Sequence, residues 1–319
     1  MPTFDHAFDW ARRHVESGAL PTAVVGIATA DGVVALEAFG EASVDDHYPL
    51  FSITKPIVGL AALALVEEGR LTPTTPLTAA LPAFGANRDD VVQLRHLVSH
   101  TSGITEPAMD LPGLRTRLLA ADRDFQAGTV SRYSTLAFEG VAALIEHASG
   151  AAWQERVTEI ARRADAPGLT FDPEASRHDP VDAAEQGIDW DRMKRIGHPG
   201  AGLFARASDL LALGSALLRD DGAIVSPLTA QAMRRPLTAG LPKLDPYPAE
   251  RGQDWGFTWN LRHAAPGLLA SDTYGHGGWA GTEFWITPSL GRCFVLLTNR
   301  ANRPGVDADE LHNAVAAAR

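Results

Sequence analysis

FSITKPIVGLAALALVEEG, residues 51–69, predicts a buried helix whose first turn carries Ser52 and Lys55. Side chains three positions apart share one face of a helix. Pro56 has no N–H to donate, so it fits only near the start of the helix, where the first N–H groups need no partner. Gly69 suits the C-cap. A helix start is electropositive and offers free N–H groups, which suits a serine that acts as a nucleophile.

The lysine at position 55 is informative because the chain has only two others, Lys194 and Lys243, among its 28 basic residues. Arginine stays protonated in proteins, whereas a buried lysine can lose its proton and act as a base. Taken alone, the pair is also typical of a serine that merely caps a helix. Other parts of a site must join Ser52 and Lys55 to favour chemistry.

Composition favours an ordinary soluble globular protein of one large or two smaller domains. The chain has 319 residues, of which 45% are hydrophobic and 21% charged. A net charge of -11 without a basic run argues against nucleic acid as a partner. Residues 1–18 predict an amphipathic helix without signal-peptide features, and no segment has the length and apolarity of a membrane span. The lone Cys293 cannot form an internal disulfide. From these features together we expect a cytoplasmic protein without a membrane partner.

The order of periodic segments predicts the fold class. Strands are expected at both ends of the chain, at residues 22–29, 33–39, 255–261, 282–287 and 293–299. Helices are expected at residues 91–100, 111–121, 136–149, 153–164, 207–219 and 307–318, the helix at 207–219 having Ser208 or Asp209 as its N-cap. The pattern predicts an α+β fold in which an antiparallel sheet built from both chain ends is flanked by helices and carries an inserted all-helical domain.

The same order predicts the domain boundaries. Residues 1–75 and 200–319 form the discontinuous sheet domain, residues 76–199 form the helical domain, and the site lies at their interface. The irregular stretches at residues 166–197 and 236–253 are expected to be loops that wall the site.

Two further motifs are candidates for the site. Tyr133, Ser134 and Thr135 precede an apolar helix, and the segment YGHGGW at residues 274–279 precedes a strand. Adjacent glycines at a strand edge mark a bulge or a close approach of ligand to backbone. A packing tyrosine and a structural histidine, His276, are the alternatives for these positions.

In this order the motifs S-x-x-K, Y-x-(polar) and H-G-G resemble the serine β-lactamase and penicillin-binding-protein-like superfamily. The closest pattern is that of its class C-like branch, which includes the family VIII carboxylesterases. LVSHTSGI at residues 97–104 resembles the L-x-T-H-T-S-G segment of that branch. HPGAGLFARASDLLALG at residues 198–214 resembles its A-G-G-L-x-S-T-x-x-D-L segment. The resemblance covers nearly the whole chain.

The resemblance implies a serine hydrolase that forms an acyl-enzyme on Ser52. Lys55 or Tyr133 would be the base, and either needs its pKa lowered by roughly 3 units, about 4 kcal/mol, to work at neutral pH. The other implied roles are an oxyanion hole from the backbone N–H groups of Ser52 and Trp279, cleft lining and orientation of the substrate or of the Tyr133 proton by His276, and substrate binding by Thr135, Gly277 and Gly278.

Two departures from the family pattern bear on the substrate. Thr135 replaces the asparagine of Y-x-N, and His276 replaces the lysine of K-T-G. Both favour a small-molecule ester or amide over a β-lactam, and we predict a carboxylesterase for small to medium esters without a cofactor. The alternatives are a D-amino-acid peptidase or amidase, a β-lactamase, a biosynthetic acyltransferase and a non-catalytic sensor. His96 and His100 have the i, i+4 spacing of zinc ligands, but Leu97 stands where a metalloprotease has glutamate, so no metal is predicted.

Overall fold

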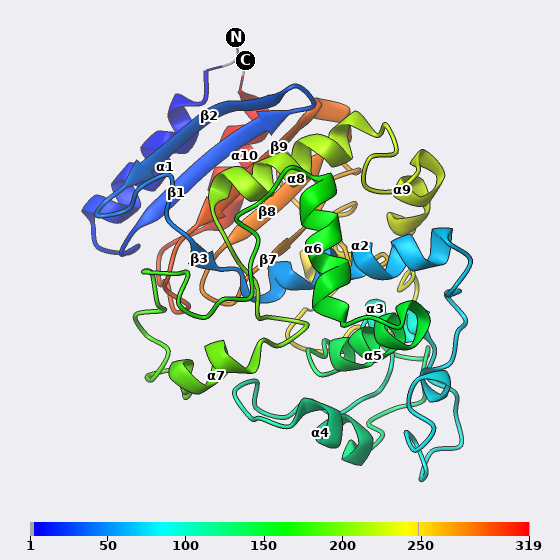
Figure 1. Ribbon diagram of the computed structural model, residues 1–319. Helices are drawn as coiled ribbons and strands as arrows, with labels where there is room; N and C mark the ends of the chain where they lie inside the picture. Colours follow the sequence, from blue (N-terminus) through cyan, green and yellow to red (C-terminus); the bar gives the residue numbers. More distant parts are fainter. Residues whose placement is uncertain (1–2, 248, 319) are drawn as a thin grey trace.

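The computed structural model describes residues 3–247 and 249–318, in which one antiparallel sheet of seven strands forms the centre of the fold (Figure 1). Its strand order is β2-β1-β9-β8-β7-β6-β5. The strands are β1 Ala23–Thr29, β2 Gly32–Phe39, β5 Asp254–Trp255, β6 Asn260–Leu261, β7 Tyr274–Gly277, β8 Glu283–Thr287 and β9 Arg292–Leu297. Because β1 pairs antiparallel with β9, the sheet joins the two ends of the chain, which confirms the predicted fold class.

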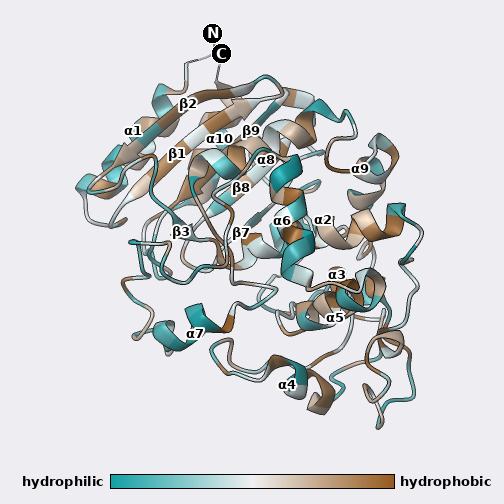
Figure 2. Ribbon diagram, viewed as in Figure 1, coloured by the Kyte–Doolittle hydropathy of each residue, from teal (hydrophilic) through white to brown (hydrophobic). Residues whose placement is uncertain are grey.

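Helices cover both faces of this sheet. On one face lie α1 (Asp5–Glu16) and α10 (Ala308–Ala317), which form an apolar cluster with Trp285 and Phe294 of the strands. On the other face α8 (Ala207–Arg219) packs against β1 and β9. Figure 2 shows β1 as hydrophobic over most of its length, as expected for a central strand buried on both faces.

The helix that follows Ser52 is the centre of the second half of the core. It is α2 (Thr54–Glu67), and its residues are buried from Thr54 to Leu65, as expected for a helix that is apolar on all sides. It packs against α5 and α6, so one continuous apolar cluster joins the sheet to the helical region. The helices of that region are α3 Leu94–Val98, α4 Leu114–Ala120, α5 Ala137–Ser149, α6 Trp153–Arg163 and α7 Trp190–Ile196.

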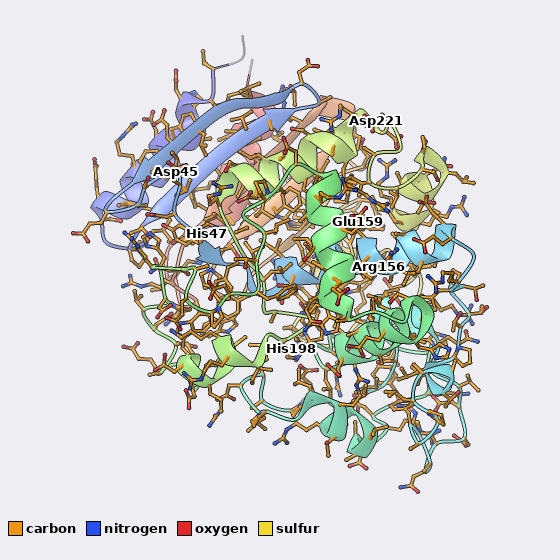
Figure 3. The ribbon with its side chains drawn as sticks, viewed as in Figure 1. Asp45, His47, Arg156, Glu159, His198 and Asp221 are labelled. Atoms are coloured by element: carbon orange, nitrogen blue, oxygen red, sulfur yellow. The ribbon has the colours of Figure 1, made fainter. Side chains whose placement is uncertain are left out.

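Within the described residues no named strand lies between β3 (Tyr48–Pro49) and β4 (Phe204–Ala205), two short strands that pair with each other. The segment between them is therefore helices and loops. The polar surface of α6 carries Arg156 and Glu159 (Figure 3), and Arg156 pairs with Glu68 after the end of α2. The division into domains at residues 75 and 199 stays a prediction. None of the described helices combines the length and apolarity needed to cross a membrane.

Several local predictions were wrong. Residues 255–261 form the hairpin β5–β6 rather than one strand, because Thr258 adopts a left-handed φ of 69° and its N–H bonds to Val98 O. The stretch at 166–197 contains α7, whose N-cap Asp189 accepts from the Arg192 N–H. A further short helix, α9 (Pro227–Met233), was not expected.

Two helix caps also differ from the predictions. The N-cap of α8 is Arg206, and Asp209 instead lies at the third helical position, where its carboxylate accepts from the Arg206 N–H. The C-cap of α2 is Glu68, and Gly69 follows it with a φ of 69°, the left-handed conformation that glycine adopts readily.

Candidate active site

Ser52 lies in a sharp 3-10 turn, Phe51–Ile53, that leads directly into α2. Phe51 has a positive φ of 46°, which is strained for an aromatic residue and persists only where the surroundings hold it. The Phe51 ring packs between Trp190 and Trp279, with centroid distances of 5.4 and 5.2 Å. The turn therefore presents Ser52 at the wall of a pocket.

Lys55 is fully buried one turn after Ser52. Its Nζ atom donates to Ser52 Oγ at 3.0 Å, to the Gly200 carbonyl at 2.9 Å and to Thr135 Oγ1 at 3.3 Å. Burial lowers the pKa of Lys55 to about 7, although the nearby carboxylate of Glu106 favours the charged form. A substantial fraction of this amine is therefore neutral at neutral pH and able to accept a proton.

Gly200 was not predicted as a site residue, and its carbonyl fixes the Lys55 amine. The Gly200 N–H donates to His198 Nδ1 at 2.9 Å, beside α7 (Figure 3). Burial lowers the pKa of His198 to about 3, so its imidazole is neutral and can accept. A Cβ atom at Gly200 would lie 3.0 Å from Thr135 Cγ2, which explains glycine at this close approach. The segment at residues 198–214 resembles a family segment, but every residue has a backbone carbonyl, so no motif identifies Gly200 as the acceptor.

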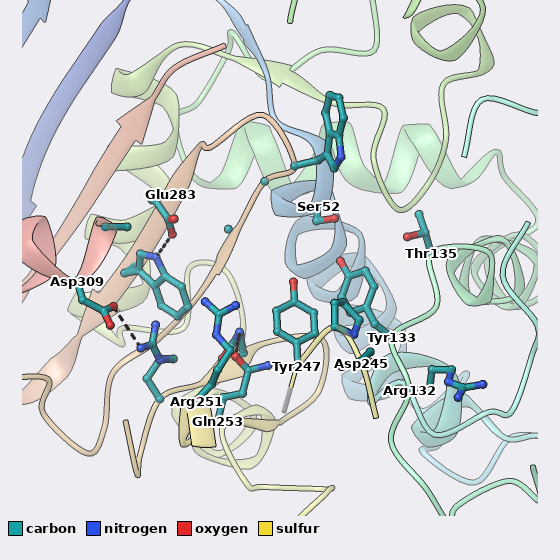
Figure 4. A pocket seen from close by; sticks show the side chains of 18 of the residues that line it. Ser52, Arg132, Tyr133, Thr135, Asp245, Tyr247, Arg251, Gln253, Glu283 and Asp309 are labelled. Carbon is teal, nitrogen blue, oxygen red and sulfur yellow. Dashed lines mark hydrogen bonds and ion pairs between the residues drawn. The ribbon is translucent and has the colours of Figure 1, made fainter. Parts of the chain in front are cut away.

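Tyr133 and Thr135 lie across the pocket from α2. The Tyr133 hydroxyl points toward Ser52 (Figure 4), and Lys55 Nζ lies 4.6 Å from the centroid of the Tyr133 ring. Burial raises the pKa of Tyr133 well above its usual value, and Tyr247 adds to the rise, while a contact with the Ser52 hydroxyl opposes it. The phenol is therefore protonated at neutral pH.

Glu106 also lines this pocket and was missed by the sequence analysis. Its Oε2 atom accepts from Ser134 Oγ at 2.8 Å and from the Leu136 N–H at 3.1 Å, which holds the chain on both sides of Thr135. Burial of the carboxyl by the surrounding protein raises the pKa of Glu106. The side chain is nevertheless exposed where it lines the pocket. No motif marks Glu106, because its contacts join residues about thirty positions apart.

The H-G-G segment lies on β7 and in the turn after it. His276 is fully buried, and its Nδ1 contacts the Gly277 carbonyl at 2.7 Å, so the expectation that it lines the cleft is wrong. The rings of Tyr133 and Trp255 lie beside its ring, with centroid distances of 6.1 and 5.4 Å. Burial lowers the pKa of His276 to about 3. Its role in orienting Tyr133 stays a prediction.

The turn after β7 carries the other predicted residues. Gly277, Gly278 and Trp279 all line the pocket. The Gly278 N–H donates to the Thr282 carbonyl at 2.7 Å, and the Gly281 N–H donates to the Gly278 carbonyl at 3.0 Å. These bonds make a tight turn that brings Trp279 beside the Phe51 ring and close to Ser52. The use of the Ser52 and Trp279 N–H groups as an oxyanion hole stays a prediction.

The pocket has a volume of about 570 Å³ and reaches from Ser52 to α10. The loop at 236–253 walls it as expected, through Asp245, Pro246 and Tyr247, whereas no described residue of 166–197 contributes to its lining. Further lining comes from Met109, Arg132, Arg251, Gln253, Asn260, Arg262, Glu283, Trp285, Ala308, Asp309 and His312.

His96 and His100, which have the spacing of zinc ligands, make separate contacts. The Nδ1 atom of His96 accepts from the Gln93 N–H at 3.2 Å, and that of His100 accepts from the Ser134 N–H at 3.1 Å. Across residues 3–247 and 249–318, no three histidine, cysteine or acidic side chains are grouped closely enough to hold a metal ion.

A sheet built from both chain ends, with a serine and a buried lysine at the start of its central helix, defines a serine hydrolase of the β-lactamase fold. The chain belongs to the Beta-lactamase family, whose sequence profile matches residues 8–319. This is the superfamily that the three motifs predicted, and the family VIII esterase-like branch fits the relatives that follow.

Among curated proteins, esterase EstB of Burkholderia gladioli is 28% identical over 85% of this chain and 82% of its own length. Among solved structures, EstCE1, described as a hydrolase with promiscuous acyltransferase activity, has a TM-score of 0.79 at 20% identity and covers 98% of this chain and 97% of its own. The D-stereospecific amidohydrolase from a Streptomyces species has a TM-score of 0.76 at 19% identity, with 98% of both chains covered. These two structures are similar to this chain in fold.

Proposed function

We propose that this protein is a carboxylesterase that cleaves small to medium esters through an acyl-enzyme on Ser52. The observation that carries the proposal is the 3.0 Å contact between Lys55 Nζ and Ser52 Oγ, together with the lowered pKa of Lys55. A serine hydroxyl becomes a competent nucleophile when a neighbouring base accepts its proton. The contact supplies that base within hydrogen-bond reach.

The opposite pKa directions of Lys55 and Tyr133 divide the proposed acid and base roles. Neutral Lys55 accepts the Ser52 proton as Oγ attacks the ester carbonyl, and the N–H groups of Ser52 and Trp279 bind the oxyanion that forms. Tyr133, which stays protonated, gives its hydroxyl proton to the departing alkoxide and regains a proton from the Lys55 ammonium. The alcohol leaves and the acyl group remains on Ser52.

Deacylation reverses these proton transfers with water in place of the alcohol. Water attacks the acyl carbonyl and passes its proton through Tyr133 to Lys55. The new tetrahedral intermediate then collapses, the C–O bond to Ser52 breaks, and the Ser52 oxygen regains its proton from Lys55 as the carboxylic acid is released. No cofactor enters this cycle.

Two observations favour an ester as substrate. Thr135 offers one hydroxyl where the family pattern has a carboxamide, and that hydroxyl accepts from Lys55. The similarity to esterase EstB also supports this activity. A location in the cytoplasm stays a prediction from the sequence.

The test compares p-nitrophenyl butyrate with a chromogenic cephalosporin, using wild type, Ser52→Ala and the matched control Ser215→Ala. Ser215 is a buried serine on α8, outside the pocket lining. We expect ester turnover and an acyl adduct in the intact mass of wild type and Ser215→Ala, and neither in Ser52→Ala. Wild-type ester turnover that survives in Ser52→Ala would contradict the proposal, as would turnover of the cephalosporin alone.

A further inference from the structure

Polar side chains gather at one end of the pocket, where Glu283 and Trp285 of β8 lie beside Gly277 and Gly275 of β7. A Cβ atom at Gly275 would lie 2.6 Å from the Trp285 ring, and one at Gly277 would lie 3.3 Å from Glu283 Oε2. The polar side chains of this end that line the pocket are Arg251, Gln253, Asn260, Arg262, Glu283 and Asp309. We call this group the distal end of the pocket.

Arg262 is the most informative residue of the distal end. It is only 5% exposed, and its buried Nε has no hydrogen-bond partner among the residues that the structure describes. Its Nη2 atom reaches Asp309 Oδ1 at 3.4 Å, and the Asp309 side chain is 45% exposed. The guanidinium also lies over the Trp285 ring, 5.6 Å from its centroid, but a buried guanidinium with one long hydrogen bond is under-satisfied, and such groups in native proteins require an explanation. A ligand in the pocket supplies one.

A second buried donor faces the same space. Gln253 is 3% exposed, and its amide nitrogen Nε2 also has no partner within the described part of the chain. The other end of the Gln253 amide is fixed, because its Oε1 accepts from Asn260 Nδ2 at 3.1 Å. Gln253 and Arg262 therefore both offer donors to the pocket.

The charges at the distal end favour an anionic acceptor. Arg251 adds a second guanidinium, held with its central carbon 5.5 Å from the Tyr247 ring centroid. The carboxylate of Glu283 is engaged by the indole N–H of Trp285 at 2.5 Å, and burial raises its pKa, while the guanidinium groups of Arg303, Arg262 and Arg251 oppose the rise. Asp309 is the other acid, and it is turned toward Arg262 and solvent. Two guanidinium groups and an amide N–H are the kind of donors that bind a carboxylate.

A row of aromatic rings connects the distal end to the reacting serine. The Tyr133 and Tyr247 ring centroids lie 5.2 Å apart, and Arg251 follows on the far side of Tyr247. Figure 4 shows Tyr247 between Tyr133 and Arg251, with Glu283 and Asp309 beyond them. Since Tyr133 is the proposed proton donor to the leaving alkoxide, the alcohol part of the substrate lies on this side.

We propose that Arg251, Gln253 and Arg262 form a subsite for a carboxylate carried by the alcohol part of the ester. The substrate class is then an ester of a hydroxy or phenolic acid, whose acyl group is transferred to Ser52 while the acid end is held near α10. This inference rests on the proposed esterase activity and names its substrate class.

The test compares kcat/KM for 4-carboxyphenyl butyrate with that for its neutral isostere 4-carbamoylphenyl butyrate, at pH 7.5 and low salt. We expect wild type to favour the carboxylate by about tenfold or more, the effect of a charge-assisted hydrogen bond. Arg262→Gln and Arg251→Gln should each reduce this ratio toward one, mainly through KM. The matched control is Arg132→Gln, because Arg132 lines the pocket but pairs with Asp124 on the Thr135 side, and it should keep the ratio.

Each outcome bears on the proposal. Equal rates for the two esters in wild type, or a preference for the carbamoyl ester, would overturn the subsite and leave the esterase activity standing. Monophenyl glutarate carries its carboxylate on the acyl part, and a preference for it over phenyl butyrate that depends on Arg251 would overturn the assignment to the alcohol. Turnover of no ester would reject the esterase proposal itself. Arg251 is exposed, so Arg251→Gln keeps the test valid if Arg262→Gln does not fold.

Discussion

Lys55 Nζ and Ser52 Oγ lie 3.0 Å apart, in a site where the Gly200 carbonyl and the Thr135 hydroxyl occupy the other two positions around the amine. A neutral amine has two N–H donors and one lone pair. If the donors go to Gly200 and Thr135, the lone pair faces Ser52. Deprotonation of Lys55 therefore reverses the direction of this hydrogen bond. The serine hydroxyl then donates to the amine, which is the arrangement that acylation requires.

The first prediction is a pH dependence set by Lys55. Because the free enzyme needs a neutral amine and the pKa of Lys55 is about 7, kcat/KM for p-nitrophenyl butyrate should rise about tenfold per pH unit below pH 7 and level off above it. Initial rates between pH 5.5 and 9 measure this. His276→Gln should keep the step, since His276 does not titrate in this range. A flat profile from pH 5.5 to 8 would exclude Lys55 as the base.

The second prediction links the same lysine to stability. Above about pH 7 the folded state holds Lys55 neutral, whereas the unfolded chain keeps it protonated up to the ordinary lysine pKa of 10.5. The unfolded state thus binds more protons in this window, and the free energy of unfolding contributed by Lys55 rises with pH. Relative to Lys55→Met, the free energy of unfolding of wild type should rise by about 2 kcal/mol between pH 7 and pH 9. The slope of this rise is at most about 1.36 kcal/mol per pH unit. Urea unfolding of both proteins at the two pH values gives the difference, and parallel curves would contradict it.

Sequence reasoning succeeded where a local pattern determines the position of a residue. The apolar segment at 51–69 predicted a buried helix with Ser52 and Lys55 side by side, and they are, although α2 begins at Thr54 and Ser52 lies in the 3-10 turn before it. Thr135 lies 80 positions from Lys55, and no spacing rule joins them. Only the resemblance to a family with the same motif order predicted that they would meet.

The remaining parts of the site depend on tertiary contacts that have no local sign. The Gly200 carbonyl acts through its backbone, which every residue has, and it reaches Lys55 across 145 positions. His276 could line the cleft or be buried, and its packing beside Tyr133 and Trp255 is a tertiary contact that no local pattern predicts. The hairpin β5–β6 that supplies Trp255 was itself predicted as one strand.

The third prediction concerns the hydroxyl of Thr135. Thr135→Val keeps the shape of the side chain but removes an acceptor 3.3 Å from Lys55 Nζ, which leaves a buried N–H unpaired and disfavours the ammonium form. The step in the pH–rate profile should move to lower pH by up to about one unit, equivalent to about 1.36 kcal/mol. Thr135→Ser retains the hydroxyl and is the control that should keep the step in place. Identical profiles for the two variants would show that the hydroxyl does not act on Lys55.

The fourth prediction contrasts the adjacent glycines of the H-G-G segment. A Cβ atom at Gly278 would lie 1.9 Å from Thr282 Oγ1 and 2.5 Å from the Leu50 carbonyl, two residues before Ser52. Gly278→Ala must therefore displace the turn that carries Trp279, and we expect a loss of about 1–3 kcal/mol in unfolding free energy. Because small displacements of reacting groups are costly, kcat/KM should fall more than about tenfold.

Gly277→Ala is the matched comparison, because its Cβ would meet only the Glu283 carboxylate, at 3.3 Å or more, and no backbone atom. It should fold with nearly wild-type stability and retain hydrolysis of p-nitrophenyl butyrate. Thermal unfolding and initial rates of both variants give the contrast. If Gly278→Ala matched Gly277→Ala in both measurements, the turn would not hold Trp279 in a position on which catalysis depends, and the proposed oxyanion donor would have to be sought elsewhere.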